Sequence, residues 1–166
     1  MNCKSGRLGM NISQCPDCGH LEFHNNPCRN RNCPNCQVVN KEVWVDKRRA
    51  EVIDTPYFHV VFTLPHELNP LVYCNQQLLY ALLHRCCAQT LLELSSNEKW
   101  LGATPGIIQV LHTWDQEMGY HVHMHCIISG GGLTADQKIK KSKSTFFIPV
   151  GVLRDKFKGK YLAELD

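Results

Sequence analysis

Every second residue from His121 to His125 is a histidine, and this alternation constrains the fold more than any other feature of the 166-residue sequence. The residues between them, Val122 and Met124, are apolar, and such alternation predicts a β-strand. Alternate side chains of a strand lie on one face, so three imidazoles would share a small volume. Burying them without a cation to bind their lone pairs is costly. The pattern therefore favours a metal site over histidines that are merely hydrogen-bonded in a core.

A fourth histidine strengthens the prediction of a metal site. It lies in an apolar, β-branched run, residues 106–114, and a short polar stretch with a glycine separates this run from the histidine-rich strand. A hairpin turn in that stretch places His112 opposite His123, and cross-strand Cβ atoms are about 5 Å apart. We expect His112, His123 and His125 to bind one divalent ion with open coordination positions, as in catalytic sites. His121 is either a further ligand or a flanking residue.

Two Cys-x-x-Cys pairs near the start of the chain predict a second, structural metal site. Cys15 and Cys18 form the first pair, Cys33 and Cys36 form the second, and fourteen residues separate the pairs. This spacing is close to that of four-cysteine zinc sites, and four thiolates leave no position for a substrate. Cys28, or a histidine in the same loop, could replace a ligand or help to hold a second ion. The other cysteines are expected to be small apolar residues: Cys3, Cys74, Cys86, Cys87 and Cys126.

Disulfide bonds are the competing interpretation of these cysteines. Residues 1–11 contain no apolar run of the kind found in a signal peptide, and no stretch is long enough to cross a membrane. We therefore expect a cytoplasmic location, where thiols stay reduced and zinc is favoured. Residues 1–40 are then a zinc-binding module that does not fold without its metal.

The rest of the sequence predicts an α+β domain over residues 57–166, connected to the zinc-binding module by a linker helix over residues 41–56. Residues 57–64 form an apolar run that predicts a buried strand. An Asn-Pro start and periodic apolar residues predict a helix over residues 69–94. Two antiparallel strands follow, and the glycine triplet at residues 130–132 is expected to end the second as a turn. A strand, a helix and a hairpin in this order predict an antiparallel sheet with its helix packed on one face.

A basic tract lies between residues 138 and 160, where one acidic residue, Asp155, stands against eight lysines and arginines. Such a tract is usually a solvated face or a disordered arm. Beside a metal site it is also what binding to a phosphate backbone requires. We therefore expect the following residues to bind the phosphate backbone of a nucleic acid: Lys138, Lys140, Lys141, Lys143, Arg154, Lys156, Lys158 and Lys160.

Seven stretches of the sequence together resemble one protein family. In order, they are CPDCGH, CRNRNCPNCQ, YFHVVFTLPHELN, NQQLLYALL, LHTWDQ, HVHMHCIISGGGL and FFIPVGVLRDKFKGKYL. They resemble the IS91 family of rolling-circle insertion-sequence transposases, and the resemblance extends over residues 7–166. It implies a zinc-binding module followed by an HUH-endonuclease-like domain, in which His123-Met124-His125 is the HUH motif and His112 or His121 is the third ligand.

The resemblance also implies a reaction and its cofactors. In this family Zn²⁺ is structural, and Mg²⁺ or Mn²⁺ at the HUH site polarises a scissile phosphate of single-stranded DNA at a transposon end. A tyrosine hydroxyl then attacks this phosphate. The family's Tyr-x-x-x-Tyr pair is absent from this sequence, which leaves Tyr161 as the remaining candidate nucleophile. We therefore expect the N-terminal portion of a transposase with an incomplete HUH domain, or alternatively a non-catalytic, zinc-dependent DNA-binding fragment of unspecified oligomeric state.

Overall fold

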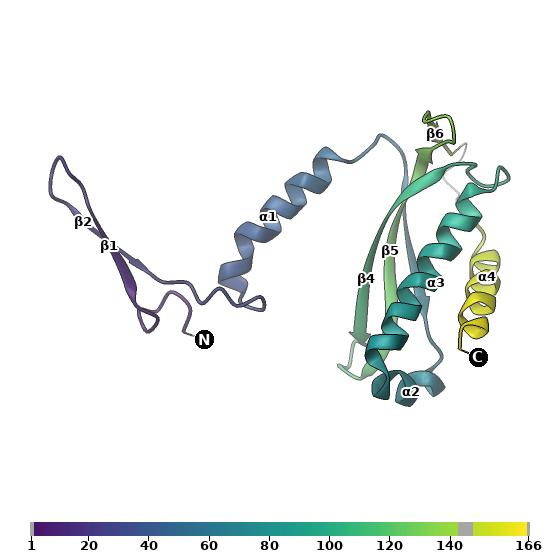
Figure 1. Cartoon of the computed structure of the whole chain (residues 1–166), viewed down its shortest axis with the longest axis horizontal. Helices are drawn as coiled ribbons and strands as arrows, with labels where there is room; N and C mark the ends of the chain where they lie inside the picture. Colours follow the sequence, from purple (N-terminus) through teal and green to yellow (C-terminus); the bar gives the residue numbers. More distant parts are fainter. Residues whose placement is uncertain (1, 143–147, 166) are drawn as a thin grey trace. The chain divides into compact units, whose positions relative to one another are not determined.

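The structure of the chain is a computed structural model that describes residues 2–142 and 148–165, and it has two compact units (Figure 1). The first unit is Met1–Val52 and the second is Ile53–Asp166. Each unit combines α-helical structure with an antiparallel sheet, so the predicted α+β class is confirmed. Along the described residues, no helix has both the length and the apolar character that crossing a membrane requires.

The first unit contains a two-stranded hairpin and one helix. Strand β1 (Met10–Gln14) pairs antiparallel with β2 (Leu21–Asn25), and helix α1 (Pro34–Ala50) follows. Proline suits the first turn of a helix because its missing N–H would have no partner there. The helix begins earlier than the predicted linker helix: Cys33 is its N-cap residue and Cys36 lies in its first turn. Three basic residues in its last turn complement the negative end of the helix dipole: Lys47, Arg48 and Arg49.

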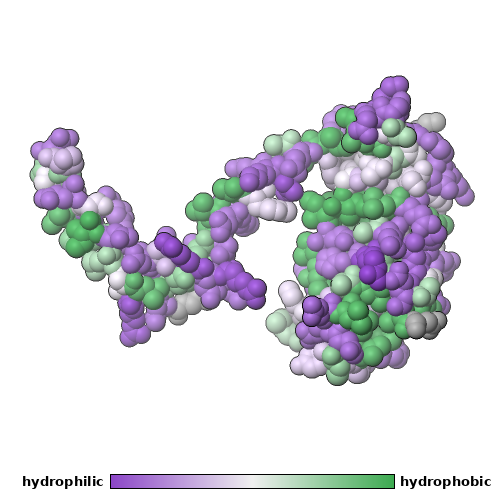
Figure 2. Space-filling model, in the orientation of Figure 1, coloured by the Kyte–Doolittle hydropathy of each residue, from purple (hydrophilic) through white to green (hydrophobic). Residues whose placement is uncertain are grey.

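This first unit has almost no apolar core. Of its described residues, only Cys33 is buried, and apolar side chains on both the hairpin and α1 are exposed. Figure 2 shows these as hydrophobic patches that interrupt an otherwise hydrophilic surface. A unit of about this size cannot fold on so little apolar burial, so a metal or another cross-link must supply the stability.

The second unit is a four-stranded antiparallel sheet with helices. Strand β5 (Tyr120–Leu133) lies between β3 (Tyr57–Thr63) and β4 (Thr104–Trp114), and β6 (Ile139–Lys141) pairs with the end of β5 beyond β3. A short 3-10 helix, η1 (His66–Leu68), follows β3. The other elements are α2 (Asn69–Cys74), α3 (Gln76–Ser96) and α4 (Val150–Ala163). Asn75, between α2 and α3, leaves the helical conformation and divides the helix that the sequence predicted to be continuous.

Helices α3 and α4 pack against one face of this sheet (Figure 1). The alternation of β5 decides which residues they cover: Val122, Met124, Cys126 and Ile128 have no exposed surface and face the helices. Phe62 of β3 contacts Phe157 of α4 with ring centroids 4.8 Å apart. The other face of the sheet carries the histidines. Strand β3 therefore has one exposed face, and it is not the fully buried strand that its apolar sequence predicted.

The glycine triplet was predicted to form a turn, and this prediction is wrong. Gly130, Gly131 and Gly132 lie inside β5, where β4 pairs with one side and β6 with the other. The main chains approach closely at this point, and a Cβ at Gly132 would lie 2.2 Å from the Thr104 carbonyl oxygen. Glycine is therefore required here for close packing of strands.

Replacing Gly132 with alanine is expected to destabilise the second unit by about 3 kcal/mol, because the backbone of β4 must move to admit the methyl group. Urea denaturation of the purified chain measures this loss. Gly151→Ala is the matched control, because a Cβ there meets no atom within 4 Å and the site is helical. Alanine should stabilise that helix by up to about 1 kcal/mol. Equal effects of the two substitutions would contradict the close approach at Gly132.

Candidate metal centres

Three histidines of the second unit meet on the face of the sheet that the helices leave uncovered. His112 of β4 is paired with His123 of β5, which confirms the cross-strand register expected from the sequence. Their ligand nitrogens, together with one of His125, all lie within 4.8 Å of one another. The ring centroid of His112 is 5.3 Å from that of His123 and 4.4 Å from that of His125. Three imidazoles at these separations can bind one ion.

Hydrogen bonds orient two of these rings. The Nδ1 atom of His123 lies 3.1 Å from the main-chain carbonyl oxygen of His121, so this nitrogen carries the proton and donates it. Its Nε2 atom then keeps a free lone pair. The Nδ1 atom of His125 lies 2.8 Å from Nε2 of His59 on β3. His121 is outside the group of three, and its contribution is the carbonyl oxygen rather than the imidazole.

Burial and the neighbouring imidazoles keep His125 neutral. Burial lowers its pKa first, and the nearby rings of His112, His123 and His59 lower the pKa further because positive charges close together repel. A histidine binds a metal only through an unprotonated nitrogen. The cluster therefore favours the ligand form of His125 at neutral pH.

The donor set fits a divalent transition metal. Imidazole nitrogen is a common ligand of first-row transition metals, whereas Mg²⁺ prefers oxygen ligands and retains water. Of the two ions expected from the sequence, Mn²⁺ therefore suits three imidazoles better. The group is half-buried rather than enclosed, so coordination positions remain accessible from solvent.

An aromatic side chain borders the histidines. The Trp114 ring stacks on His112 with ring centroids 4.9 Å apart and planes inclined by 15°, and the residue is 46% exposed. Val61, Val110 and Ile127 are also exposed, and they flank the histidines on the three paired strands. The surroundings of the cluster are thus apolar and aromatic.

Four cysteines of the first unit form a second cluster. The Sγ atoms of Cys3, Cys28, Cys33 and Cys36 all lie within 4.8 Å of one another. The Sγ atom of Cys36 is 3.4 Å from that of Cys3 and 3.7 Å from that of Cys28. A tetrahedral zinc site with Zn–S bonds of about 2.3 Å has sulfur–sulfur edges of about 3.8 Å, so the cluster matches such a site in size. The Cys36 backbone N–H lowers the pKa of Cys33 to about 7, which favours the thiolate that zinc requires.

The first Cys-x-x-Cys pair lies apart from this cluster. Cys15 and Cys18 lie at the turn of the hairpin, whereas Cys3 and Cys28 lie at its open end. Five strand residues separate the two ends, a distance of about 17 Å. Backbone N–H groups of Cys18 and Asp17 lower the pKa of Cys15, but the described residues bring no third ligand to this pair.

Cys3, which the sequence predicts to be a small apolar residue, is a member of this cluster. A signal for it was present in the chain, because Cys3 precedes β1 and Cys28 follows β2. Antiparallel pairing of β1 with β2 brings these two cysteines to the same end of the hairpin. The hairpin pairing therefore accounts for the presence of Cys3 and Cys28 beside the second Cys-x-x-Cys pair.

Tyr161 lies on the opposite side of the sheet from the histidines. It is 3% exposed, packs against Phe157 within the helix-covered core, and burial raises the pKa of its hydroxyl. Tyr120 faces the same core and bonds to Tyr80. Tyr57 shares the histidine face, but its hydroxyl group bonds to the main chain of Ile53. None of these tyrosines points toward His112, His123 and His125.

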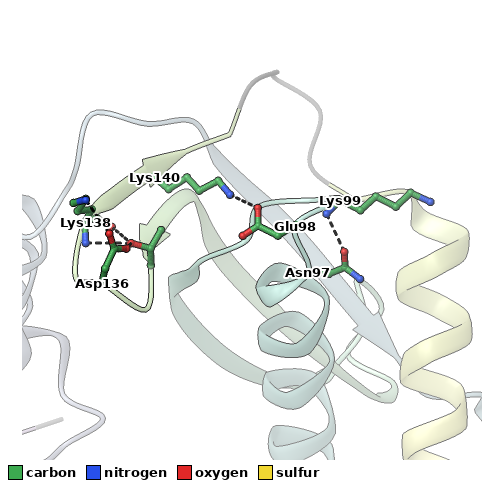
Figure 3. A network of polar contacts seen from close by, with 7 residues as sticks. Asn97, Glu98, Lys99, Asp136, Lys138 and Lys140 are labelled. Carbon is green, nitrogen blue, oxygen red and sulfur yellow. Dashed lines mark hydrogen bonds and ion pairs between the residues drawn. The ribbon is translucent and has the colours of Figure 1, made fainter.

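The structure separates the predicted basic tract from the histidines. Lys140 and Lys141 are in β6 and pair with Gly132 and Gly131, about 20 Å along β5 from His125. Figure 3 shows Lys140 bonded to Glu98 and Lys138 beside Asp136. On α4, Lys156 and Lys160 both bind Glu93 of α3, Arg154 pairs with Asp155, and Lys158 is exposed. Lys143 lies outside the described residues.

These ion pairs do not exclude binding to DNA. Exposed pairs are worth about 0–1 kcal/mol each, so a phosphate can displace the acidic partner. They do show that the paired lysines of β6 and α4 bind acidic residues of the protein: Lys140 binds Glu98, Lys141 binds Asp54, and Lys156 and Lys160 bind Glu93. A DNA contact of Lys140 or Lys141 would therefore lie away from the histidine cluster.

Two family models match separate parts of the chain. One, described as a transposase zinc-binding domain, matches residues 1–64, which include the four-cysteine cluster. The other, described as "Putative transposase", matches residues 106–166, which include the three histidines. No solved structure matches the chain.

Two curated relatives match most of the chain. A Sinorhizobium fredii protein named "Putative transposase y4qJ" is 41% identical over 165 residues, which are 99% of this chain and 42% of the relative. The transposase for insertion sequence element IS801 of Pseudomonas savastanoi pv. phaseolicola is 33% identical over 133 residues, 79% of this chain and 32% of the relative. The chain spans less than half the length of these relatives.

Proposed function

Because the chain belongs to the IS91 family of transposases, we propose that it holds the divalent-metal part of a rolling-circle transposase site and binds single-stranded DNA there. The observation that carries this proposal is the convergence of His112, His123 and His125, whose ligand nitrogens lie within 4.8 Å of one another. The Cys3, Cys28, Cys33 and Cys36 cluster holds the structural zinc of the same protein. A DNA substrate implies a place in the bacterial cytoplasm, at the nucleoid.

The three imidazoles suit chemistry on a phosphate. Neutral ligands would leave the net charge of a bound Mn²⁺ or Mg²⁺ unchanged, and such an ion would polarise phosphate oxygens and stabilise the charge that develops on them. The protein's part is to fix the ligand nitrogens, through the main-chain bond of His123 and the contact of His125 with His59. It also leaves this face of the sheet open, so that a DNA strand can reach the cluster.

The exposed Trp114 ring favours a single strand over a duplex. Unpaired bases stack on aromatic side chains, whereas the bases of a duplex are already stacked and paired. A phosphate bound beside His112 would place its flanking base within reach of the ring that stacks on that histidine. Exposed Val110 on the same face adds apolar contact for a base.

We expect Trp114→Ala to weaken binding of a fluorescent single-stranded oligonucleotide by about 5- to 100-fold, because base stacking on an aromatic ring contributes about 1–3 kcal/mol. Fluorescence anisotropy in the presence of Mn²⁺ measures the affinity, with duplex DNA of the same sequence as competitor. Tyr73→Ala is the matched control, because Tyr73 is 63% exposed on α2, outside the histidine face. Equal losses for the two variants, or tighter binding of the duplex, would contradict the proposal.

A non-catalytic, zinc-dependent DNA-binding protein is the second candidate function. It is favoured by the placement of Tyr161, which is buried on the helix-covered side, across the sheet from the histidines. Denaturing electrophoresis of the protein with labelled single-stranded DNA and Mn²⁺ separates the two functions. A covalent adduct would exclude this candidate, whereas binding without an adduct that also survives His123→Ala would support it.

A further inference from the structure

His59 contacts the cluster of His112, His123 and His125 but is not one of its three members. On β3 it is paired with Ile127 of β5, which makes it a diagonal neighbour of His125 on the same face of the sheet. Its Nε2 atom lies 2.8 Å from Nδ1 of His125, and the two rings are nearly parallel, with centroids 5.0 Å apart. The ligand nitrogens that converge in the cluster belong to the other three histidines.

A 2.8 Å contact between two imidazole nitrogens holds one proton. The nitrogen that carries this proton decides whether Nε2 of His125 can bind a metal. If Nδ1 of His125 carries the proton, it donates to His59, and Nε2 of His125 has a free lone pair for a metal. If Nε2 of His59 carries the proton instead, a neutral His125 has its proton on Nε2. That second arrangement blocks the nitrogen that an ion in the cluster requires.

An outer hydrogen bond also fixes the tautomer of His123. Its Nδ1 atom faces the His121 carbonyl oxygen, which can only accept, so Nε2 of His123 is left for the ion. Metal-binding histidines usually use their second ring nitrogen in this way, and the outer partner fixes the tautomer and the ring orientation. His125 has an imidazole in place of a carbonyl as its outer partner, and that imidazole is His59.

We propose that His59 is a positioning residue that accepts the Nδ1 proton of His125 and holds its Nε2 atom ready for the divalent ion. This inference rests on the proposed function, because it assigns a role toward the ion of that same site. It does not make His59 a fourth ligand, since the nitrogen nearest the cluster is occupied by the contact with His125. His59 is exposed, so it can be replaced without opening the core.

Two variants of the full chain test the hydrogen bond directly. His59→Phe keeps a flat ring on β3 but cannot accept a proton, whereas His59→Gln retains an acceptor oxygen. His66→Phe is the control, because His66 is an exposed histidine in the 3-10 helix and outside the cluster. The probe is Mn²⁺ alone, titrated calorimetrically into zinc-loaded protein. The tautomer of His125 is read in the metal-free site from ¹⁵N chemical shifts at about pH 8, where imidazoles are neutral.

The expected result is a loss of Mn²⁺ affinity of about 10- to 100-fold in His59→Phe, recovered for the most part in His59→Gln and absent in His66→Phe. The ¹⁵N shifts should show the Nδ1–H tautomer of His125 in the wild type and a mixture in His59→Phe. Unchanged affinity and tautomer in His59→Phe would overturn the inference, as would equal losses in the Phe and Gln variants. If the wild type fails to bind Mn²⁺, the proposed function fails, and the tautomer measurement still decides the role of His59.

Discussion

Replacing Cys33 with alanine is expected to unfold the first unit and to release its zinc, while the second unit stays folded. Of the described residues before Ile53, Cys33 is the only buried one, so the unit has little stability apart from the ion. Structural zinc contributes an apparent binding free energy of about 10–16 kcal/mol in small zinc-binding domains. Losing one of four thiolates removes most of this.

Hydrogen–deuterium exchange with peptide-level readout measures this effect, together with the zinc content of the purified chain. In Cys33→Ala, the amides of α1 should exchange as in an unfolded peptide, and those of β5 should keep their protection. Cys74→Ala is the control, because Cys74 is an exposed thiol on α2 in the other unit. A chelator added to the wild type should reproduce the exchange pattern of Cys33→Ala.

A second pair of variants distinguishes the structural cluster from the sequence motif. Cys3→Ala should lose the zinc, because the Sγ atom of Cys3 lies 3.4 Å from that of Cys36. Cys15→Ala should retain it, because Cys15 is at the far end of the hairpin. Loss of zinc from Cys15→Ala with retention in Cys3→Ala would show that the Cys-x-x-Cys spacing, and not the structure, identifies the ligands.

Local periodicity was enough to predict the centre of the second unit. The alternation of His121 to His125 assigns the strand and its two faces, and a turn in a short polar stretch fixes the register that pairs His112 with His123. The same alternation in β3 puts His59 on the histidine face, opposite Phe58, Val60 and Phe62. That pattern was present in the sequence, but the contact of His59 with His125 depends on how β3 and β5 pair.

The features that could not be predicted depend on contacts between distant segments. The glycine triplet has the composition of a turn, and only the approach of the Thr104 carbonyl oxygen shows why glycine is required within the strand. Helix α4 was not predicted, because its lysines and arginines made the segment read as a basic tract. Its apolar residues Leu153, Phe157 and Tyr161 are nevertheless spaced four residues apart and all face the core. Its lysines were assigned to DNA, and the structure shows two of them bonded to Glu93.

Mn²⁺ binding at the histidine cluster is expected to be lost in His123→Ala and retained in His121→Ala. His123 supplies one of three converging ligand nitrogens, whereas His121 contributes its main-chain carbonyl oxygen, which alanine retains. Removing an outer partner of a metal ligand typically lowers metal affinity about 10- to 100-fold. The loss of affinity in His123→Ala, which removes a ligand itself, should be larger. Calorimetric titration of zinc-loaded protein with Mn²⁺ measures both affinities. The two residues are half-buried neighbours on one face of β5, so the comparison controls for damage to the strand.

The affinity for Mn²⁺ should also depend on pH in a direction that the cluster fixes. Burial and the surrounding imidazoles lower the pKa of His125 from its ordinary 6.5, so this ligand stays neutral at pH values where an exposed histidine begins to bind a proton. Mn²⁺ affinity should therefore fall on acidification, because protons compete with the ion for the His125 nitrogen. Without metal, the unfolded chain takes up this proton more readily than the folded one, so acidification should also lower the stability of the second unit. Titrations and thermal unfolding at about pH 7.5 and about pH 5.5 test both effects, and an affinity that rises on acidification would contradict binding through neutral imidazoles.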